Sequence, residues 1–142
     1  MGRFIQMFRC YRPPLRTDQR SLLVVDDDPA SRRLLRRVLA PLGFRLSEAG
    51  SVAEAEAVLR AERFDVLLTD VVLPDGNGCA LALDAHARQA GLVVVFLSGY
   101  GRQILAKYGL VDPAARFVEK PFDGQELRDQ VTSAVAARDG AA

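Results

Sequence analysis

The sequence has only two cysteines and one histidine, and it contains no long hydrophobic run. Cys10 and Cys79 lie far apart without Cys-x-x-Cys spacing, so a zinc site is not expected. We expect both cysteines to be reduced, as is usual in the cytosol. The longest apolar run, Leu92 to Leu97, is far shorter than the roughly 20 residues that cross a bilayer. Two arginines interrupt the apolar cluster at the N-terminus, which argues against a secretory signal. A cytoplasmic protein without a membrane span is therefore predicted.

Length and composition fit one folded domain. The chain has 142 residues, of which 49% are apolar and 26% charged, and these values are typical of a globular protein. A domain of this size needs no disulfide or metal to fold. We predict a basic N-terminal extension over residues 1–19, one domain over residues 20–138 and a short tail over residues 139–142.

The N-terminal extension carries a charge of the opposite sign to the body. The net charge is +1, but residues 1–20 hold five arginines and one aspartate, so the rest of the chain is acidic. Phe4, Ile5, Phe8 and Tyr11 could share one helical face, which leaves open a mobile tail or an amphipathic segment that docks on a partner or a membrane surface. Because the body is acidic and shows no helix-turn-helix pattern, direct nucleic-acid binding is not expected.

From Ser21 onward, apolar runs alternate five times with helix-like periods, which is typical of β-α units around a parallel sheet. The predicted strands are Leu22 to Val25, Phe44 to Ala49, Val66 to Leu68, Val93 to Leu97 and Arg116 to Glu119. The first, third and fourth are nearly continuous in branched apolar residues, as central strands covered on both faces require. The second alternates, which indicates an edge strand. The fold class is α/β, with a doubly wound parallel sheet.

Capping residues and periodicity predict five helices. Asp28 caps the first helix, and Ser51 with Glu54 forms a capping box for the second. The third is predicted over residues 78–89, the fourth over 102–108, where Gly109 stops it, and the fifth over 123–138. In the first helix the expected inward stripe is Leu34, Leu35, Val38 and Leu39, and the expected outward residues are Arg32, Arg33, Arg36 and Arg37. In the fifth the expected buried face is Leu127, Val131, Ala134 and Val135.

Polar residues stand at the ends of the predicted strands. Asp26 and Asp27 follow the first strand, Asp70 the third, Ser98 the fourth and Lys120 the fifth. In an open parallel sheet the carboxyl ends of the strands meet at one edge, where ligands bind. Carboxylates brought close together repel one another and call in a cation, and Mg²⁺ prefers such oxygen ligands. The sequence therefore predicts a Mg²⁺ site at this edge.

The same cluster has the groups that phosphoryl transfer needs. A carboxylate such as Asp70 can act as nucleophile, and the transition state spreads negative charge over the equatorial oxygens of the phosphoryl group. Lys120 offers a positive charge to one of these oxygens, and Ser98 can donate a hydrogen bond to another.

Four short motifs follow in order along the chain. They read Val-Val-Asp-Asp-Asp-Pro at residues 24–29, Thr-Asp-Val-Val-Leu-Pro-Asp-Gly-Asn-Gly at 69–78, Leu-Ser-Gly-Tyr at 97–100 and Phe-Val-Glu-Lys-Pro-Phe at 117–122. Over about residues 20–138 the sequence resembles the receiver domain of response regulators in two-component signalling, and four motifs in order make the resemblance specific. It implies a flavodoxin-like five-stranded sheet with strand order 2-1-3-4-5 and five helices, as in single-domain, CheY-like receivers.

The resemblance also implies a role for each residue of the cluster. Asp70 is similar to the phospho-acceptor, Asp27 to a direct Mg²⁺ ligand, and Asp26 to a direct or water-mediated one. The backbone carbonyl of Val72 is implied as a further ligand. Lys120 would report the new charge to the fifth strand. A domain of this kind is not an enzyme in the usual sense, because it catalyses only its own phosphorylation and dephosphorylation.

Partners follow from the same resemblance. The phosphodonor would be a histidine kinase or a histidine phosphotransfer protein, and Ser98 with Phe117 would form the switch pair that couples the phosphoryl group to the output surface. Because the first helix begins beside the acidic cluster, we expect the kinase to dock on Arg32, Arg33, Arg36 and Arg37. Only four residues follow Arg138, so the output is expected to be protein contact, including homodimerisation.

Two alternatives stay open on the sequence. Asp26 and Asp28 form an Asp-x-Asp pair followed later by a serine and a lysine, the order used by haloacid-dehalogenase-type phosphatases, in which Asp26 would be the nucleophile. The missing threonine-like residue after the pair and the absence of a late acidic pair argue against it. The second alternative, a non-phosphorylated interaction module of the same fold, is disfavoured by the complete acidic set.

Two further residues are interpreted as structural or left open. His86 has no companion at ligand spacing, so we expect a partly exposed structural residue and not a phosphocarrier. Tyr100 is predicted at the start of the fourth helix, where a role on the output surface and plain packing are both open.

Overall fold

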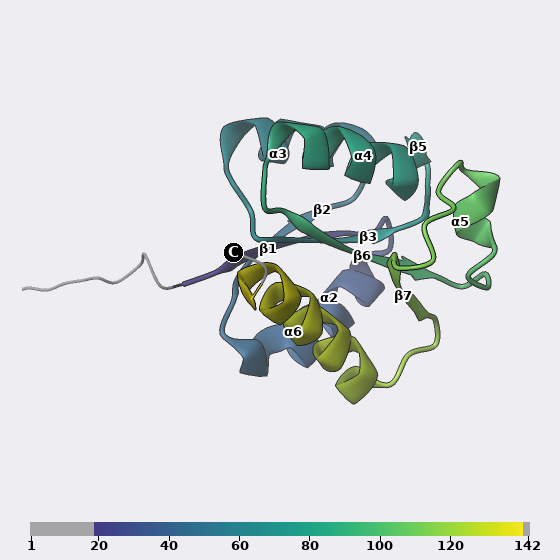
Figure 1. Cartoon of the computed structure of the whole chain (residues 1–142). Helices are drawn as coiled ribbons and strands as arrows, with labels where there is room; N and C mark the ends of the chain where they lie inside the picture. The colour runs from purple at the N-terminus through teal and green to yellow at the C-terminus, as the bar shows by residue number, and fades with distance from the viewer. Residues whose placement is uncertain (1–18, 141–142) are drawn as a thin grey trace, which may run out of the picture.

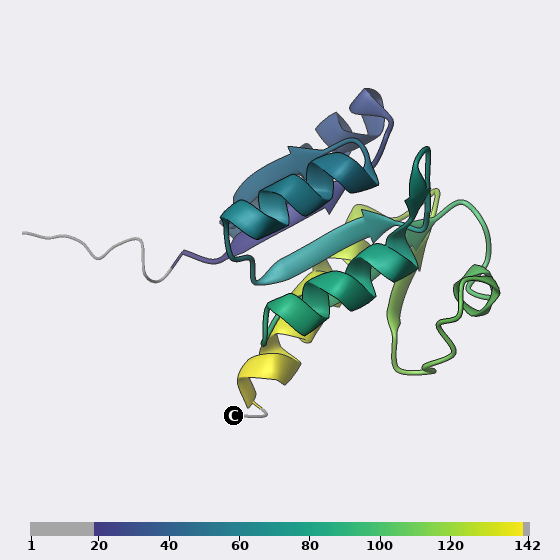
Figure 2. The same cartoon turned by 90° about the horizontal axis from the view of Figure 1, so that it is seen from above.

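Five parallel strands form a single sheet with helices on both faces (Figures 1 and 2). The computed structural model describes residues 19–140, so the predictions for the N-terminal extension and Cys10 lie outside the described residues. The strands are β1 (Ser21–Val25), β2 (Arg45–Ala49), β3 (Val66–Asp70), β6 (Val93–Ser98) and β7 (Arg116–Glu119). Their order is β2-β1-β3-β6-β7 and all neighbours are parallel, which confirms the predicted fold and strand order.

The helices cover the sheet unequally. They are α2 (Pro29–Leu39), α3 (Val52–Ala61), α4 (Gly78–Arg88), the short α5 (Ile104–Lys107) and α6 (Gly124–Gly140), with a 3-10 turn η1 (Ala40–Leu42) after α2. Figure 1 shows α3 and α4 on one face and α2 and α6 on the other. The fifth predicted helix continues two residues past its expected end, and the fourth is shorter than expected at both ends. Among the described residues, no helix has the length and apolar character to cross a membrane.

The core consists of two apolar layers separated by the sheet. Along β1, Leu23 and Val25 face the layer under α3, α4 and α5, whereas Leu22 and Val24 face the layer under α2 and α6. The two-residue period of a strand places alternate side chains on opposite faces, so a strand that is buried throughout serves both layers. The expected buried face of α6 is confirmed, and its members are Leu127, Val131, Ala134 and Val135.

The expected inward stripe of α2 is wrong at one position. Leu35 and Leu39 are fully buried, but Leu34 is 46% exposed. Successive helical residues are about 100° apart, so Leu34 lies on the flank once Leu35 points at the sheet. Arg32 lies nearer the sheet than expected and its side chain is only 20% exposed, so the prediction that it faces outward is also wrong.

Local signals start the helices as expected. The Asp28 carboxylate accepts from the Ala30 N–H at 3.0 Å, and the Ser51 hydroxyl accepts from the Glu54 N–H at 3.1 Å. The Glu54 carboxylate departs from the standard capping box, because it accepts from the Gly50 N–H at 2.7 Å. Gly109 follows α5 with φ of 88°, the left-handed conformation that ends a helix.

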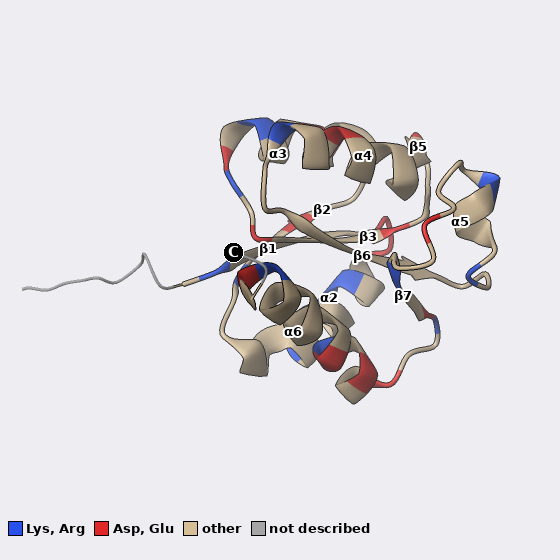
Figure 3. Ribbon diagram, in the orientation of Figure 1, with Lys and Arg blue, Asp and Glu red and all other residues tan. Residues whose placement is uncertain are grey.

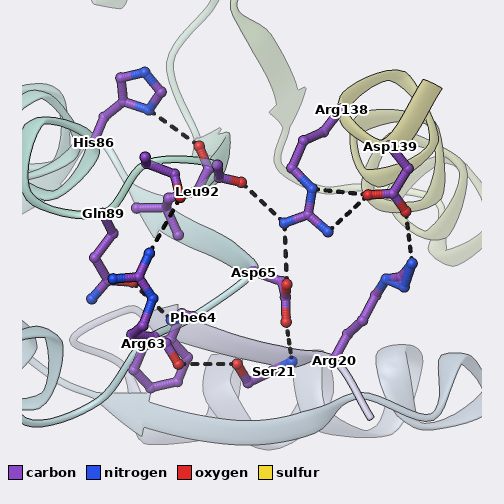
Figure 4. A network of polar contacts seen from close by, with 12 residues as sticks. Arg20, Ser21, Arg63, Phe64, Asp65, His86, Gln89, Leu92, Arg138 and Asp139 are labelled. Carbon is purple, nitrogen blue, oxygen red and sulfur yellow. Dashed lines mark hydrogen bonds and ion pairs between the residues drawn. The ribbon is translucent and has the colours of Figure 1, made fainter. Parts of the chain in front are cut away.

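A polar network fastens the end of the sheet where β1 begins (Figure 4). The Asp65 carboxylate accepts from the Ser21 N–H at 2.9 Å and from Arg138 at 3.1 Å. Arg138 also pairs with Asp139, and Asp139 pairs with Arg20 at 2.6 Å. The network joins the C-terminal turn of α6 to the first residues of β1 at the pole opposite the strands' carboxyl ends.

Candidate functional site

The structure brings the predicted acidic residues together at the carboxyl ends of the strands. One carboxylate oxygen from each of Asp26, Asp27 and Asp70 lies within 4.8 Å of the others. Figure 3 shows acidic segments on loops at the end of the sheet toward which the strands run. Asp70 is the last residue of β3, and Asp26 and Asp27 follow β1, its neighbour in the sheet. Parallel pairing of β1 and β3 therefore creates the cluster.

Asp26 is the most enclosed member, at 1% exposed. Its carboxylate accepts from the Asp28 N–H at 2.9 Å, the Ser31 hydroxyl at 2.7 Å and the Lys120 ammonium at 2.8 Å. Burial alone would raise the pKa of Asp26, but these hydrogen bonds and the Lys120 charge outweigh it and hold the pKa below its usual value. Asp26 is thus an ionised, internally satisfied carboxylate. Ser31 was not predicted, although its place in the first turn of α2 puts it over the end of β1.

Lys120 lies between two carboxylates. Its Nζ is 2.8 Å from Asp26 Oδ2 and 3.1 Å from Asp70 Oδ2. Partial burial disfavours the charged ammonium, yet the two carboxylates prevail and raise the pKa of Lys120 above its usual value. The Lys120 N–H donates to the Ser98 carbonyl at 2.8 Å, and a cis peptide bond joins Lys120 to Pro121. The loop after β7 therefore delivers one positive charge to the centre of the cluster.

Asp70 differs from Asp26 in its electrostatics. Burial raises the pKa of Asp70 above its usual value, and the Lys120 charge offsets this only in part because Asp26 competes for the same ammonium and adds its own repulsion. Asp26 accepts three hydrogen bonds, whereas Asp70 is held chiefly by Lys120 and the Val72 N–H. The negative charge of Asp70 is therefore compensated less well than that of Asp26.

The donor set fits a hard divalent cation. Ligands on opposite sides of Mg²⁺ lie about 4 Å apart, since each is about 2.1 Å from the ion, which is close to the spread of the three carboxylate oxygens. Asp27 is exposed, and no residue among 19–140 donates a hydrogen bond to its carboxylate. Val72 lies two residues after Asp70 and its N–H donates to the Asp70 carboxylate, which places its backbone beside the cluster. Asp27 and Asp70 are the best-placed carboxylate ligands.

The predicted switch residues occupy neighbouring strands. Ser98 ends β6, is completely buried, and its hydroxyl accepts from the Tyr100 N–H at 3.0 Å. Its partner across the parallel pair is Glu119, two residues after Phe117 on β7. Phe117 is half-buried against the apolar layer that includes α5. Ser98 and Phe117 therefore lie on adjacent strands, and Phe117 packs in the apolar layer that also contains residues of α5.

The four arginines of α2 divide into two pairs. Arg32 and Arg36 both reach Glu48 on β2, at 3.2 Å and 2.6 Å. Arg33 and Arg37 are exposed and flank the exposed Leu34. A groove of about 350 Å³ runs between α2 and the loop after β7, and its lining includes Asp28, Ser31, Leu34, Lys120 and Phe122. The sequence had predicted a uniform outward set.

A short hairpin after Asp70 was not predicted. Strands β4 (Val72–Leu73) and β5 (Gly76–Asn77) pair antiparallel, and Asp75 in their turn accepts from the Val52 and Ala53 N–H groups at 2.8 and 3.0 Å. These backbone hydrogen bonds lower the pKa of Asp75. Asp75 is the second cap of α3 and ties the hairpin to that helix. The Pro-Asp-Gly sequence signals a turn but not its partner.

Gly78 and Asn77 complete the exit from the hairpin. The Asn77 side chain accepts from the Ala80 N–H at 2.9 Å and caps α4. A Cβ on Gly78 would lie only 2.2 Å from the Asp70 carbonyl oxygen, so α4 approaches the backbone of the predicted phospho-acceptor as closely as glycine allows.

Other residues singled out from the sequence lie away from the cluster. His86 Nδ1 is 3.2 Å from the Leu92 carbonyl, in the region drawn in Figure 4, which fits a structural residue. Tyr100 is 60% exposed and lies in the loop before α5, so its predicted position at the helix start is wrong. Cys79 is buried, which raises the pKa of its thiol and fits an inert cysteine.

Comparisons with known proteins point to one family. The family model described as the response regulator receiver domain matches residues 22–132. The response regulator protein PilR of Pseudomonas aeruginosa is 36% identical over 116 residues, which cover 82% of this chain and 26% of PilR. The response regulator receiver protein CpdR of Brucella abortus is 28% identical over 116 residues, covering 82% of this chain and 97% of CpdR. The chain spans about a quarter of the length of PilR and of DctD, another Pseudomonas aeruginosa relative.

Solved structures agree on the fold. A CheY-like receiver domain protein from Methanospirillum hungatei superposes with a TM-score of 0.79 at 24% identity, covering 87% of this chain and 99% of the other. The response regulator TrrA from Thermotoga maritima, in complex with Mg²⁺ and BeF, gives a TM-score of 0.71 at 24% identity, covering 82% and 99%. With the sheet order, the acidic cluster and the matched family model in agreement, the chain belongs to the response regulator receiver domains of two-component signalling.

Proposed function

We propose that this receiver domain accepts a phosphoryl group on Asp70 from a histidine kinase or a histidine phosphotransfer protein, in a Mg²⁺-dependent reaction in the cytoplasm. The observation that carries the proposal is the position of Asp70 in the cluster. Asp70 shares Lys120 with Asp26, and one of its oxygens lies close enough to Asp27 for a single cation to contact both. The pKa of Asp70 is raised because burial outweighs the charge of Lys120.

Each residue has a chemical task. Asp70 attacks the phosphorus in line while the bond from the phosphorus to the histidine nitrogen of the donor breaks, and that nitrogen keeps the electron pair. Asp27 would hold the metal directly and Asp26 directly or through water, with the Val72 carbonyl as a further ligand. Mg²⁺, when bound, supplies charge neutralisation between the carboxylates and the phosphoryl oxygens. Lys120 already stands 3.1 Å from Asp70 and would turn to an oxygen of the transferred group. A Cβ on Gly99 would meet no atom within 4 Å, so space remains beside Ser98 for the water that removes the phosphoryl group.

The phosphatase alternative fits the site poorly. In that alternative Asp26 is the nucleophile, but Asp26 is buried and accepts from Ser31, Lys120 and the Asp28 N–H. A nucleophile needs a free lone pair directed at the phosphorus, and three hydrogen bonds leave Asp26 fewer free lone pairs than Asp70.

We further propose that the kinase docks along α2 and the adjoining groove. The exposed side chains there are Arg33, Leu34 and Arg37, and the groove of about 350 Å³ adds Phe122 and reaches Lys120. An apolar centre with a basic rim suits an amphipathic helix that presents the phosphohistidine to Asp70. Arg36 can join the rim, since it is half-exposed, whereas Arg32 is taken up by contacts within the domain.

The output is proposed to be protein contact, including homodimerisation, through the surface of α5, β7 and α6. Phosphorylation adds about −1.5 to −2 charge units at neutral pH, enough to bias a surface that has two packings. Ser98 ends β6 and Phe117 lies on the neighbouring β7, so this pair would link the acidic cluster to the surface, and Lys120 begins the loop from β7 to α6. The single-domain arrangement stays a prediction.

Incubation of the purified protein with acetyl phosphate tests the proposal. Wild type with Mg²⁺ is expected to gain the mass of one phosphoryl group by intact-mass spectrometry, and chelation of the metal should suppress the gain. Asp70→Asn should stay unmodified. The matched control is Asp65→Asn, an aspartate at the opposite pole, which should be labelled as wild type. Equal labelling of Asp70→Asn and wild type would contradict the proposal.

A further inference from the structure

Arg32 stands beside the acidic cluster but is bonded to its backbone. Its Nη1 donates to the carbonyl oxygen of Asp26, and its Nε lies 3.2 Å from Glu48 Oε1. The side chain is 20% exposed, against 51% for Arg36, which pairs with the same glutamate. A guanidinium with several donors in a fixed plane can bridge a carboxylate and a carbonyl in this way. Arg32 is thus built into the loop that follows β1.

Together with a strand hydrogen bond, the contact restrains the two peptide groups on either side of the Asp26 Cα. The Asp26 N–H donates to the Ala49 carbonyl at 3.1 Å, and the Asp26 carbonyl accepts from Arg32. Because the peptide group is planar, this carbonyl and the N–H of Asp27 turn together. The direction in which Asp27 leaves the backbone is therefore tied to the guanidinium of Arg32.

Asp27 needs such a restraint more than Asp26 does. Three donors fix the Asp26 carboxylate, whereas the Asp27 carboxylate is exposed and receives no hydrogen bond from any residue that the structure describes. Metal affinity depends on ligands held in the binding geometry before the ion arrives. For Asp27 that geometry comes from the backbone.

The surroundings leave room for this arrangement. A Cβ on Gly50 would lie 3.1 Å from Arg32 Nη1, so the missing side chain at this position lets the guanidinium lie over the backbone. Glu48 is the register partner of Val24 in the β1–β2 pair, two residues before Asp26. The sheet itself thus anchors the carboxylate that holds Arg32.

We propose that Arg32 is a positioning residue for the metal site: by clamping the Asp26 carbonyl to Glu48, it orients Asp27 toward the cation. The inference rests on the proposed function, since it takes Asp27 as a ligand. A purely electrostatic role for Arg32 would have the opposite effect on metal affinity. A cation near three carboxylates repels Mg²⁺, so loss of its charge alone would tighten metal binding. Loss of the clamp would weaken it.

Binding of Mn²⁺ to the metal-free full chain tests the proposal, with the free ion measured by its electron paramagnetic resonance signal. Arg32→Gln is expected to bind Mn²⁺ about tenfold more weakly than wild type, the usual effect of removing a residue that orients a ligand. Arg32→Lys keeps the charge but not the bridge, and should be weakened to a similar extent. Arg36→Gln removes a charge from the same Glu48 without touching the loop, and should stay within twofold of wild type, roughly the range of a surface substitution.

The outcomes separate the inference from the function beneath it. Unchanged or tighter binding by a folded Arg32→Gln, or equal weakening by Arg36→Gln, overturns the clamp. Circular dichroism establishes folding, and Arg32→Lys supplies the comparison if Arg32→Gln does not fold. If Asp27→Asn binds Mn²⁺ as tightly as wild type, Asp27 is not a ligand and the inference fails. If Asp70→Asn also binds as tightly as wild type, the ion is not held in this cluster and the proposed Mg²⁺-dependent function fails as well.

Discussion

Lys120 Nζ lies 2.8 Å from Asp26 Oδ2, and this ion pair joins the loop after β7 to the end of β1. The same ammonium lies 3.1 Å from Asp70. One lysine thus offsets the charge of two carboxylates that would otherwise repel each other. A cation that enters the cluster competes with Lys120 for these oxygens, so metal binding and the position of the lysine are linked.

Lys120→Met should destabilise the metal-free protein and increase its affinity for Mg²⁺. The substitution leaves Asp26 buried without its charged partner, which we expect to cost roughly 1–3 kcal/mol of unfolding free energy. Mg²⁺ should restore more stability to the variant than to wild type, as measured by urea unfolding with and without the metal. Lys107→Met, which removes an exposed lysine near Tyr108, is the control and should show neither effect. An unaltered Mg²⁺ response in Lys120→Met would show that the lysine does not balance the cluster.

Asp26 and Asp70 should contribute to the pH dependence of stability with opposite signs. Asp26 has a lowered pKa in the folded protein, so its contribution is present above the ordinary aspartate range near pH 4 and is lost as the pH falls through the lowered value. Asp70 has a raised pKa, so its ionisation costs stability as the pH rises through that raised value. In metal-free buffer at pH 7, Asp26→Asn should melt below wild type and Asp70→Asn above it.

Thermal unfolding between pH 3 and 7 checks this prediction. Both differences should shrink toward pH 3, since the carboxylates then become protonated in the unfolded chain. If both variants shifted the melting temperature in the same direction at pH 7, the raised pKa of Asp70 would be contradicted.

Gly78→Ala should destabilise the protein although alanine favours helices. The new Cβ would lie 2.2 Å from the Asp70 carbonyl, so the backbone of β3 or α4 must move. Overpacking of this kind typically costs about 1–3 kcal/mol, more than the roughly 1 kcal/mol of helix propensity that alanine returns. Gly99→Ala, where a Cβ meets nothing within 4 Å, is the matched control and should change the unfolding free energy by less than about 0.5 kcal/mol. Equal effects of the two substitutions in urea unfolding would refute the close approach.

Ser98 should release the Tyr100 amide when the site is phosphorylated. The Ser98 hydroxyl now accepts from the Tyr100 N–H, and a phosphoryl oxygen would draw the hydroxyl away. With Mg²⁺ and beryllium fluoride as a phosphoryl mimic, the Tyr100 amide should exchange roughly fivefold faster, since one hydrogen bond contributes about 1 kcal/mol. In Ser98→Ala this amide should exchange at the fast rate both with and without the phosphoryl mimic. The Val71 amide, bonded to the Leu97 carbonyl, is the internal control.

The sequence predicts the sheet and the acidic cluster because both depend on short-range patterns. The apolar runs of β1, β3 and β6 are nearly continuous, and Asp26, Asp27 and Asp70 lie within two residues of the ends of such runs, so topology alone brings them to one edge. The buried face of α6 follows from its period in the same way.

Contacts between distant elements could not be predicted. Asp75 caps a helix that begins 23 residues earlier, and Arg32 reaches Glu48 across 16 residues, so neither pairing leaves a local signal. Leu34 was misplaced because four apolar residues in a six-residue stretch cannot all face the sheet, and packing alone chooses which one is left on the flank. The sharing of Lys120 between Asp26 and Asp70 depends on the path of the loop after β7, which the residue types do not encode.

The position of the covalent phosphate shows which carboxylate is the nucleophile. The protein is incubated with acetyl phosphate and Mg²⁺, the acyl phosphate is trapped with borohydride, and the modified residue is mapped by peptide mass spectrometry. If Asp70 is the phospho-acceptor, Asp70 and no other aspartate should be reduced, and the signal should be lost in Asp70→Asn. A trapped adduct on Asp26, or undiminished labelling of Asp70→Asn, would contradict this assignment.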